Sequence, residues 1–111
     1  MHVKKKQLND ITVCYVDGDI DINSSPDIRN ALSDLTGRHV KKIVIDLAGV
    51  SYVDSSGLAT LVEMLKKTKS YGGKLRLSNL ADKVKSLFEI TKLEKLFEIF
   101  DNAEEALADF F

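Results

Sequence analysis

The spacing of apolar residues changes within residues 41–69, which read KKIVIDLAGVSYVDSSGLATLVEMLKKTK. A nearly continuous apolar run comes first and predicts a strand buried on both faces: Ile43, Val44, Ile45 and Leu47. We expect a loop over residues 48–53 and then an amphipathic helix, because apolar residues return at i, i+3, i+4 and i+7. That helical stripe consists of Leu58, Leu61, Val62 and Leu65.

Four more strands are predicted elsewhere, three of them from short apolar or β-branched segments. The polar, lysine-rich residues 2–7 suit the edge of a sheet, where lysines discourage pairing with other chains. Residues 11–16, 74–77 and 96–100 predict the other three strands. A turn is expected at Asn9-Asp10, so the first two strands should form a hairpin.

Three further helices are predicted from their start signals. Ser25 followed by Pro26 predicts an N-cap and a first helical position. Asn79 is expected to cap the third helix of the chain, and Asp101 with Glu104 resembles a capping box at the start of the last one. Apolar residues at helical spacing follow each signal.

The resulting order, β-β-α-β-α-β-α-β-α, predicts an α/β fold. Alternating strands and helices favour a mostly parallel mixed sheet, here of about five strands with an antiparallel N-terminal strand and about four helices. A length of 111 residues is close to the usual size of one domain, and no repeat or linker interrupts residues 1–111. We therefore expect a single domain.

Composition and charge narrow the range of functions. The net charge is −1, whereas nonspecific binding to nucleic acid depends on an excess of Lys and Arg. Cys14 is the single cysteine, which excludes an intramolecular disulfide, and its apolar surroundings predict a buried side chain. Because no apolar stretch reaches about 18 residues and no signal peptide is recognisable, we expect a cytoplasmic protein that does not enter a membrane.

Motifs for catalysis, nucleotides and metals are missing from the sequence. A serine hydrolase needs a histidine base, yet His2 lies at the N-terminus and His39 just before the buried strand. Neither G-x-x-x-x-G-K-[ST] nor G-x-G-x-x-G occurs. The acids at 17, 19 and 21 alternate as in a calcium loop but lack its remaining spacing and its terminal Glu. We therefore expect no enzymatic activity, no cofactor and no metal site.

Asp54, Ser55, Ser56 and Gly57 stand where the loop passes into the central helix. Free backbone N–H groups and the positive end of the helix dipole meet at such a start, so an anion is favoured there. A purely structural interpretation stays open, because Asp and Ser are also favoured N-cap residues.

The whole segment VIDLAGVSYVDSSGLATL resembles the phosphorylation segment of bacterial anti-sigma factor antagonists, members of the STAS domain family. The family pattern is a hydrophobic strand that ends in an acidic residue, followed by hydrophobic-Asp-Ser-Ser/Thr/Ala-Gly-Leu. The resemblance extends over essentially all 111 residues. It implies phosphorylation of the serine that follows the aspartate, which is Ser55 after Asp54, with Ser56 as the next candidate.

The resemblance also implies roles for neighbouring residues. Asp21 matches the acidic residue of a Gly-x-x-Asp segment, whose side chain lies near the phosphorylated serine. Ser56 would assist as a hydroxyl at the helix start, and Gly57 would either admit a partner's backbone or simply begin the helix. Leu58 would belong either to the core or to the interface. Ala59 departs from the pattern, because many relatives have a glycine at this position.

Partners follow from the same resemblance. The unphosphorylated protein would bind an anti-sigma factor and so release a sigma factor for transcription. In the family the anti-sigma factor is itself a serine kinase that uses ATP and magnesium, and a phosphoserine phosphatase reverses its effect. Two alternatives stay open: a constitutive STAS interaction module in which the serines only cap the helix, and a receiver-like switch phosphorylated on an aspartate such as Asp46.

Overall fold

The computed structural model describes residues 1–108 and 110. Its strands are β1 (His2–Leu8), β2 (Ile11–Asp17), β3 (Lys42–Gly49), β4 (Lys74–Ser78) and β5 (Glu98–Phe100). Its helices are α1 (Ser25–Gly37), α2 (Ser55–Ser70), α3 (Asp82–Ile90), the short 3-10 helix η1 (Leu93–Lys95) and α4 (Ala103–Leu107). The strands form one sheet in the order β1-β2-β3-β4-β5, antiparallel between β1 and β2 and parallel elsewhere. The predicted α/β fold is confirmed.

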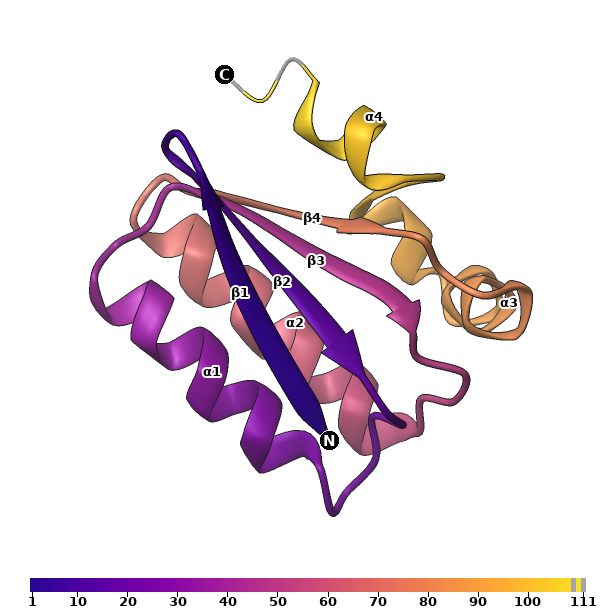
Figure 1. The fold of residues 1–111 in the computed structure, drawn as a ribbon. Coiled ribbons are helices and arrows are strands. Elements are labelled where there is room, and N and C mark those ends of the chain that lie inside the picture. Colours follow the sequence, from indigo (N-terminus) through magenta and orange to yellow (C-terminus); the bar gives the residue numbers. More distant parts are fainter. Residues whose placement is uncertain (109, 111) are drawn as a thin grey trace.

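Helices cover the two faces of this sheet unequally. The long helices α1 and α2 lie together on one face, whereas the short α4 lies on the other (Figure 1). The larger core cluster contains Ile43 and Ile45 of β3, and the smaller one contains Val44 together with Ala106 and Phe110. Strand β3 is therefore buried on both faces, as its continuous apolar run predicts.

The predicted start of α1 is wrong by one residue. Ser24, not Ser25, is the N-cap, and its side chain makes no cap hydrogen bond. The Ser25 hydroxyl instead donates to the carbonyl oxygen of Asp21 at 2.7 Å. The Asp21 carboxylate accepts hydrogen bonds from the backbone of Asn23 and Ser24, so these two N–H groups are satisfied within the loop.

Other predicted boundaries also differ. Asn79 does not cap α3, whose N-cap is Ala81, because Asn79 has a φ of 57° and its amide donates to Asp46 at 2.6 Å. Asn102, not Asp101, caps α4 and accepts from the backbone N–H of Glu105 at 2.8 Å. The last strand begins at Glu98 rather than Leu96, because the backbone N–H groups of Leu96 and Phe97 donate to the carbonyl oxygen of Leu93 in η1, at 2.9 and 3.0 Å. The loop before α2 begins later, since β3 continues through Gly49.

Candidate functional site

The loops that follow β2 and β3 lie side by side at one end of the sheet (Figure 1). These strands are parallel neighbours, so their carboxyl ends meet at the same edge. Ile20 and Val53 form an isolated parallel bridge between the two loops. The backbone N–H of Ile20 donates to Tyr52 at 2.9 Å, and that of Asp54 donates to Ile20 at 3.0 Å. The first loop thereby fixes the approach to α2.

Asp54 is the N-cap of α2 and also ties the two loops together. One carboxylate oxygen accepts from the backbone N–H of Gly57 at 2.8 Å, as an N-cap does. The other carboxylate oxygen accepts from the backbone N–H of Ile22 at 3.1 Å. The structural role considered for Asp54 and Ser55 therefore falls to Asp54.

Ser55 is the first residue of α2 and is exposed. Its hydroxyl makes no hydrogen bond to any residue that the structure describes. Ser56 is half-buried and lines a shallow hollow toward α1 together with Ile22 and Arg29. Of the two candidate phosphorylation sites, Ser55 therefore presents the more accessible hydroxyl.

The Asp21 loop reaches the serine segment, but its carboxylate faces its own loop. One oxygen of Asp21 accepts from the backbone N–H groups of Asn23 and Ser24, at 2.9 and 3.0 Å. The loop meets Asp54 through the backbone of Ile22, the residue after Asp21. Within the described residues Asp21 makes no hydrogen bond to Ser55, so its predicted role near the phosphorylated serine stays a prediction.

Gly57 is explained by close packing inside the chain. A Cβ atom there would lie 2.5 Å from the carbonyl oxygen of Ile20 and 2.7 Å from its Cγ2, closer than real Cβ contacts. The intramolecular contact thus already requires a glycine. Leu58 is 7% exposed and belongs to the larger core cluster. Partner contacts by Gly57 and Leu58 remain predictions.

Two large apolar side chains beside this corner were not predicted as functional. Ile22 is 68% exposed and Tyr52 is 55% exposed, one on each of the two loops. Exposed apolar side chains near a candidate site suit contact with another protein. Ile22 stands between Asp21 and Asn23, and an apolar residue in so polar a loop is the sequence signal that could have identified it.

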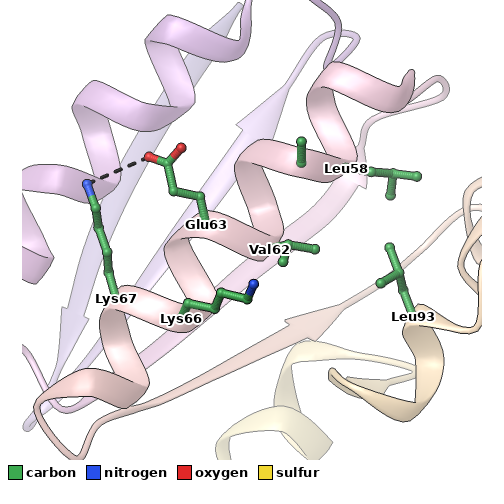
Figure 2. Close-up of a pocket in the computed structure, with 7 residues that line it drawn as sticks. Leu58, Val62, Glu63, Lys66, Lys67 and Leu93 are labelled. Carbon is green, nitrogen blue, oxygen red and sulfur yellow. Dashed lines mark ion pairs between the residues drawn. The ribbon is translucent and has the colours of Figure 1, made fainter.

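An open groove runs between α2 and η1, and we call it the α2–η1 groove. Its volume is 560 Å³, and its lining is Leu58, Ala59, Val62, Glu63, Lys66, Lys67 and Leu93. Figure 2 shows Val62 pointing toward Leu93 across the groove, with Leu58 on the same side of α2. The ion pair between Glu63 and Lys67 lies on the other side of the helix (Figure 2).

Asp46, the aspartate of the receiver-like alternative, is a buried structural residue. It is 4% exposed and accepts from the Ser78 hydroxyl at 3.0 Å and the Asn79 amide at 2.6 Å. The backbone N–H of Ala48 donates to its other oxygen at 3.0 Å. A carboxylate held in this way is poorly placed to receive a phosphoryl group, which argues against that alternative.

The described residues bear on metal binding and on membrane insertion as well. Among them, no group of three or more His, Cys, Asp or Glu side chains is arranged to hold a metal ion. None of the described helices has the length and apolar character needed to span a bilayer.

Comparisons with known proteins agree with this geometry. The sequence model of the STAS domain matches residues 2–106. The anti-sigma-B factor antagonist of Bacillus subtilis is 38% identical over 100 residues, which cover 90% of each chain.

Solved structures share the fold. An anti-sigma factor antagonist from Mycobacterium paratuberculosis has a TM-score of 0.90 at 22% identity and covers 98% of this chain and 92% of its own. SpoIIAA in its unphosphorylated form has a TM-score of 0.74 at 19% identity, with coverage of 97% and 96%. The chain therefore belongs to the STAS domain family, and its resemblance to the bacterial anti-sigma factor antagonists is confirmed.

Proposed function

We propose that this protein is an anti-sigma factor antagonist whose binding to an anti-sigma factor is controlled by phosphorylation of Ser55. The observation that carries the proposal is the contrast within one turn of α2. Asp54 and Gly57 are tied down by hydrogen bonding and packing, whereas the Ser55 hydroxyl between them is exposed and makes no hydrogen bond to a described residue. A kinase could therefore modify Ser55 without disturbing the cap.

The chemistry of the switch belongs to the partners. The anti-sigma factor would act as the serine kinase and supply ATP and magnesium, and a separate phosphoserine phosphatase would remove the phosphate. This chain would supply the acceptor hydroxyl and a binding surface, without activity of its own, and would work in the cytoplasm. In the unphosphorylated state it would hold the anti-sigma factor and leave the sigma factor available for transcription.

Phosphorylation should leave the fold unchanged. A phosphate adds a charge of about −1.5 to −2 at pH 7, and the start of α2 offers backbone N–H groups and a favourable dipole. SpoIIAA has been solved in both forms, and the two structures match this chain with TM-scores of 0.74 and 0.73. Those values support a phosphate that acts on the surface rather than on the fold.

The effect on binding should come from charge. Asp54 already places a carboxylate beside Ser55, so a partner surface matched to a neutral hydroxyl would meet a stronger anion. At a distance of ~6 Å and an effective dielectric constant of ~20, a unit negative charge on the phosphate and one on the partner repel each other by ~3 kcal/mol. A few kcal/mol weakens binding by roughly a hundredfold.

The site is tested by mass spectrometry of the protein after incubation with the anti-sigma factor kinase and ATP. We expect one added phosphate, located on Ser55. Phosphate on Ser33, Ser78 or Ser86 instead would refute the assignment of the site. If no kinase modifies the chain although the anti-sigma factor binds it, the constitutive module becomes the better description.

The switch is tested by measuring the affinity for the anti-sigma factor. Ser55→Asp should weaken binding by roughly a hundredfold, while its circular-dichroism melting curve stays within a few degrees of wild type. Ser55→Ala should bind and resist inactivation by the kinase. The matched control is Ser70→Asp, the same change at the exposed far end of α2, which should bind like wild type. Wild-type affinity of Ser55→Asp would rule out exclusion by charge.

A further inference from the structure

The α2–η1 groove is an apolar surface that lies open beside the candidate phosphorylation site. Leu58 and Val62 from α2 and Leu93 from η1 form its apolar part. Leu58 and Leu93 come from segments far apart in the sequence, and the fold brings them to one hollow (Figure 2). A groove of 560 Å³ is large enough for apolar side chains from a second protein.

The groove and Ser55 lie along the same stripe of α2. Ser55, Ala59, Val62 and Lys66 are spaced at i, i+4, i+7 and i+11, so they share one side of the helix. At 1.5 Å per residue this stripe is about 16 Å long. Ala59 is exposed and lines both the groove and the hollow beside Ser56, which makes the two surfaces continuous.

The charges around the groove are unequal. Glu63 pairs with Arg29 at 3.2 Å and with Lys67 at 3.6 Å, so its single negative charge is shared between two positive ones. Lys66 is exposed and forms no ion pair with a described residue. The positive charge of Lys66 therefore lies at the end of the groove farther from Ser55, without an acidic partner among the described residues.

We propose that the α2–η1 groove receives an amphipathic helix of the anti-sigma factor. Its apolar side chains would pack against Leu58, Val62 and Leu93, and an acidic side chain would pair with Lys66. The proposal rests on the proposed function, because it names the surface by which the same partner is held. With Ser55 at one end of the stripe, a partner helix on α2 passes close to any phosphate placed there.

The walls of the groove favour a helix over an extended peptide. Both walls are helical, so they present side chains and offer no row of unpaired backbone N–H and C=O groups. An extended segment needs such a row for its own backbone, whereas a helix satisfies its backbone internally. The apolar pair Leu58 and Val62 at i and i+4 matches the ridge that a neighbouring helix packs against.

The test uses the anti-sigma factor kinase that phosphorylates Ser55, with affinity measured by calorimetry. Lys66→Glu alters an exposed residue and should raise Kd about tenfold, with a weaker dependence on salt. Val62→Glu puts a charge into the apolar part and should raise Kd about a hundredfold. The matched control, Lys69→Glu, changes the same charge on the same helix outside the groove and should change Kd less than about twofold.

The possible outcomes separate this inference from the proposed function. Wild-type binding by folded Lys66→Glu and Val62→Glu, with loss of binding in Ser55→Asp, overturns the groove alone. A wild-type chain that does not bind the anti-sigma factor overturns the proposed function and this inference together. If sedimentation shows a homodimer that Val62→Glu dissociates, a second copy occupies the groove and the proposal is wrong. Should Val62→Glu fail to fold, the Lys66→Glu and Lys69→Glu pair decides.

Discussion

The two faces of the sheet share the same strands but are closed in different ways. On one face, α1 and α2 cover the strands with aliphatic side chains, and Leu35, Leu61 and Met64 are fully buried. On the other face, the short α4 is held through Arg76, a buried cation. The candidate site belongs to the first face, because α2 packs against that core and begins beside Asp54 at the corner.

Arg76 closes the second face with polar contacts. Its guanidinium carbon lies 5.0 Å from the ring centre of Phe100 and 4.2 Å from that of Phe110. One of its nitrogens donates to the carbonyl oxygens of Ala106 and Ala108, at 3.0 and 3.1 Å. Its Nε lies 3.3 Å from Glu98, an ion pair without hydrogen-bond geometry. One face therefore stabilises the element that carries the site, whereas the other holds α4 against the sheet.

The largest effect is expected from Leu61→Ala on the first face. Leu61 is 0% exposed, and a leucine-to-alanine change at such a position lowers the free energy of unfolding by about 2–5 kcal/mol. Chemical denaturation measures the loss. The neighbouring Val62→Ala is the control, because Val62 is half-buried and should lose clearly less. Equal losses in free energy of unfolding would mean that the difference in burial between Leu61 and Val62 does not determine their contribution to stability.

A smaller effect is expected from Arg76→Ala on the second face. Loss of the stacking and of the hydrogen bonds to the carbonyl oxygens should lower the free energy of unfolding by about 2–3 kcal/mol. We expect faster proteolysis after β5 and unchanged affinity for the anti-sigma factor, since Arg76 is not part of the corner or the groove. Arg76→Lys keeps the charge without the planar stacking and should recover only part of the loss. Weakened binding in folded Arg76→Ala would show that the two faces are coupled.

The sequence was sufficient where periodic apolar residues determine the structure. The run around Ile45 and the stripe from Leu58 predicted β3 and α2, because a regular period leaves few ways to bury these side chains. The exact caps could not be predicted, since adjacent residues such as Ser24 and Ser25 compete for the same position and the loop geometry decides between them.

The candidate site was predicted in part. The serine segment has a recognisable pattern, and the structure places it at the start of α2 as expected. The α2–η1 groove had no sequence signal, because Leu93 reaches it from a short irregular segment with no period of its own. That contact depends on tertiary packing, which a single sequence does not display.

The smallest expected effect concerns Cys14, a thiol on the face covered by α1 and α2. It is 1% exposed, and burial raises the pKa of its thiol from 9.0 to about 11, opposed by the nearby charge of Lys5. The unfolded chain loses this proton at a lower pH than the folded chain does. The stabilising contribution is therefore fully present below pH 9 and is lost as the pH rises toward 11.

The measurement compares urea unfolding of wild type and Cys14→Ala between pH 7 and pH 10.5. The alanine variant leaves a small cavity at every pH, so only the slope reports the thiol. Between the two pKa values, wild type should lose up to about 1.4 kcal/mol per pH unit more than the variant. Parallel pH profiles would show that the thiol ionises equally in both states, and hence that this face of the sheet is less tightly closed than the packing of Cys14 indicates.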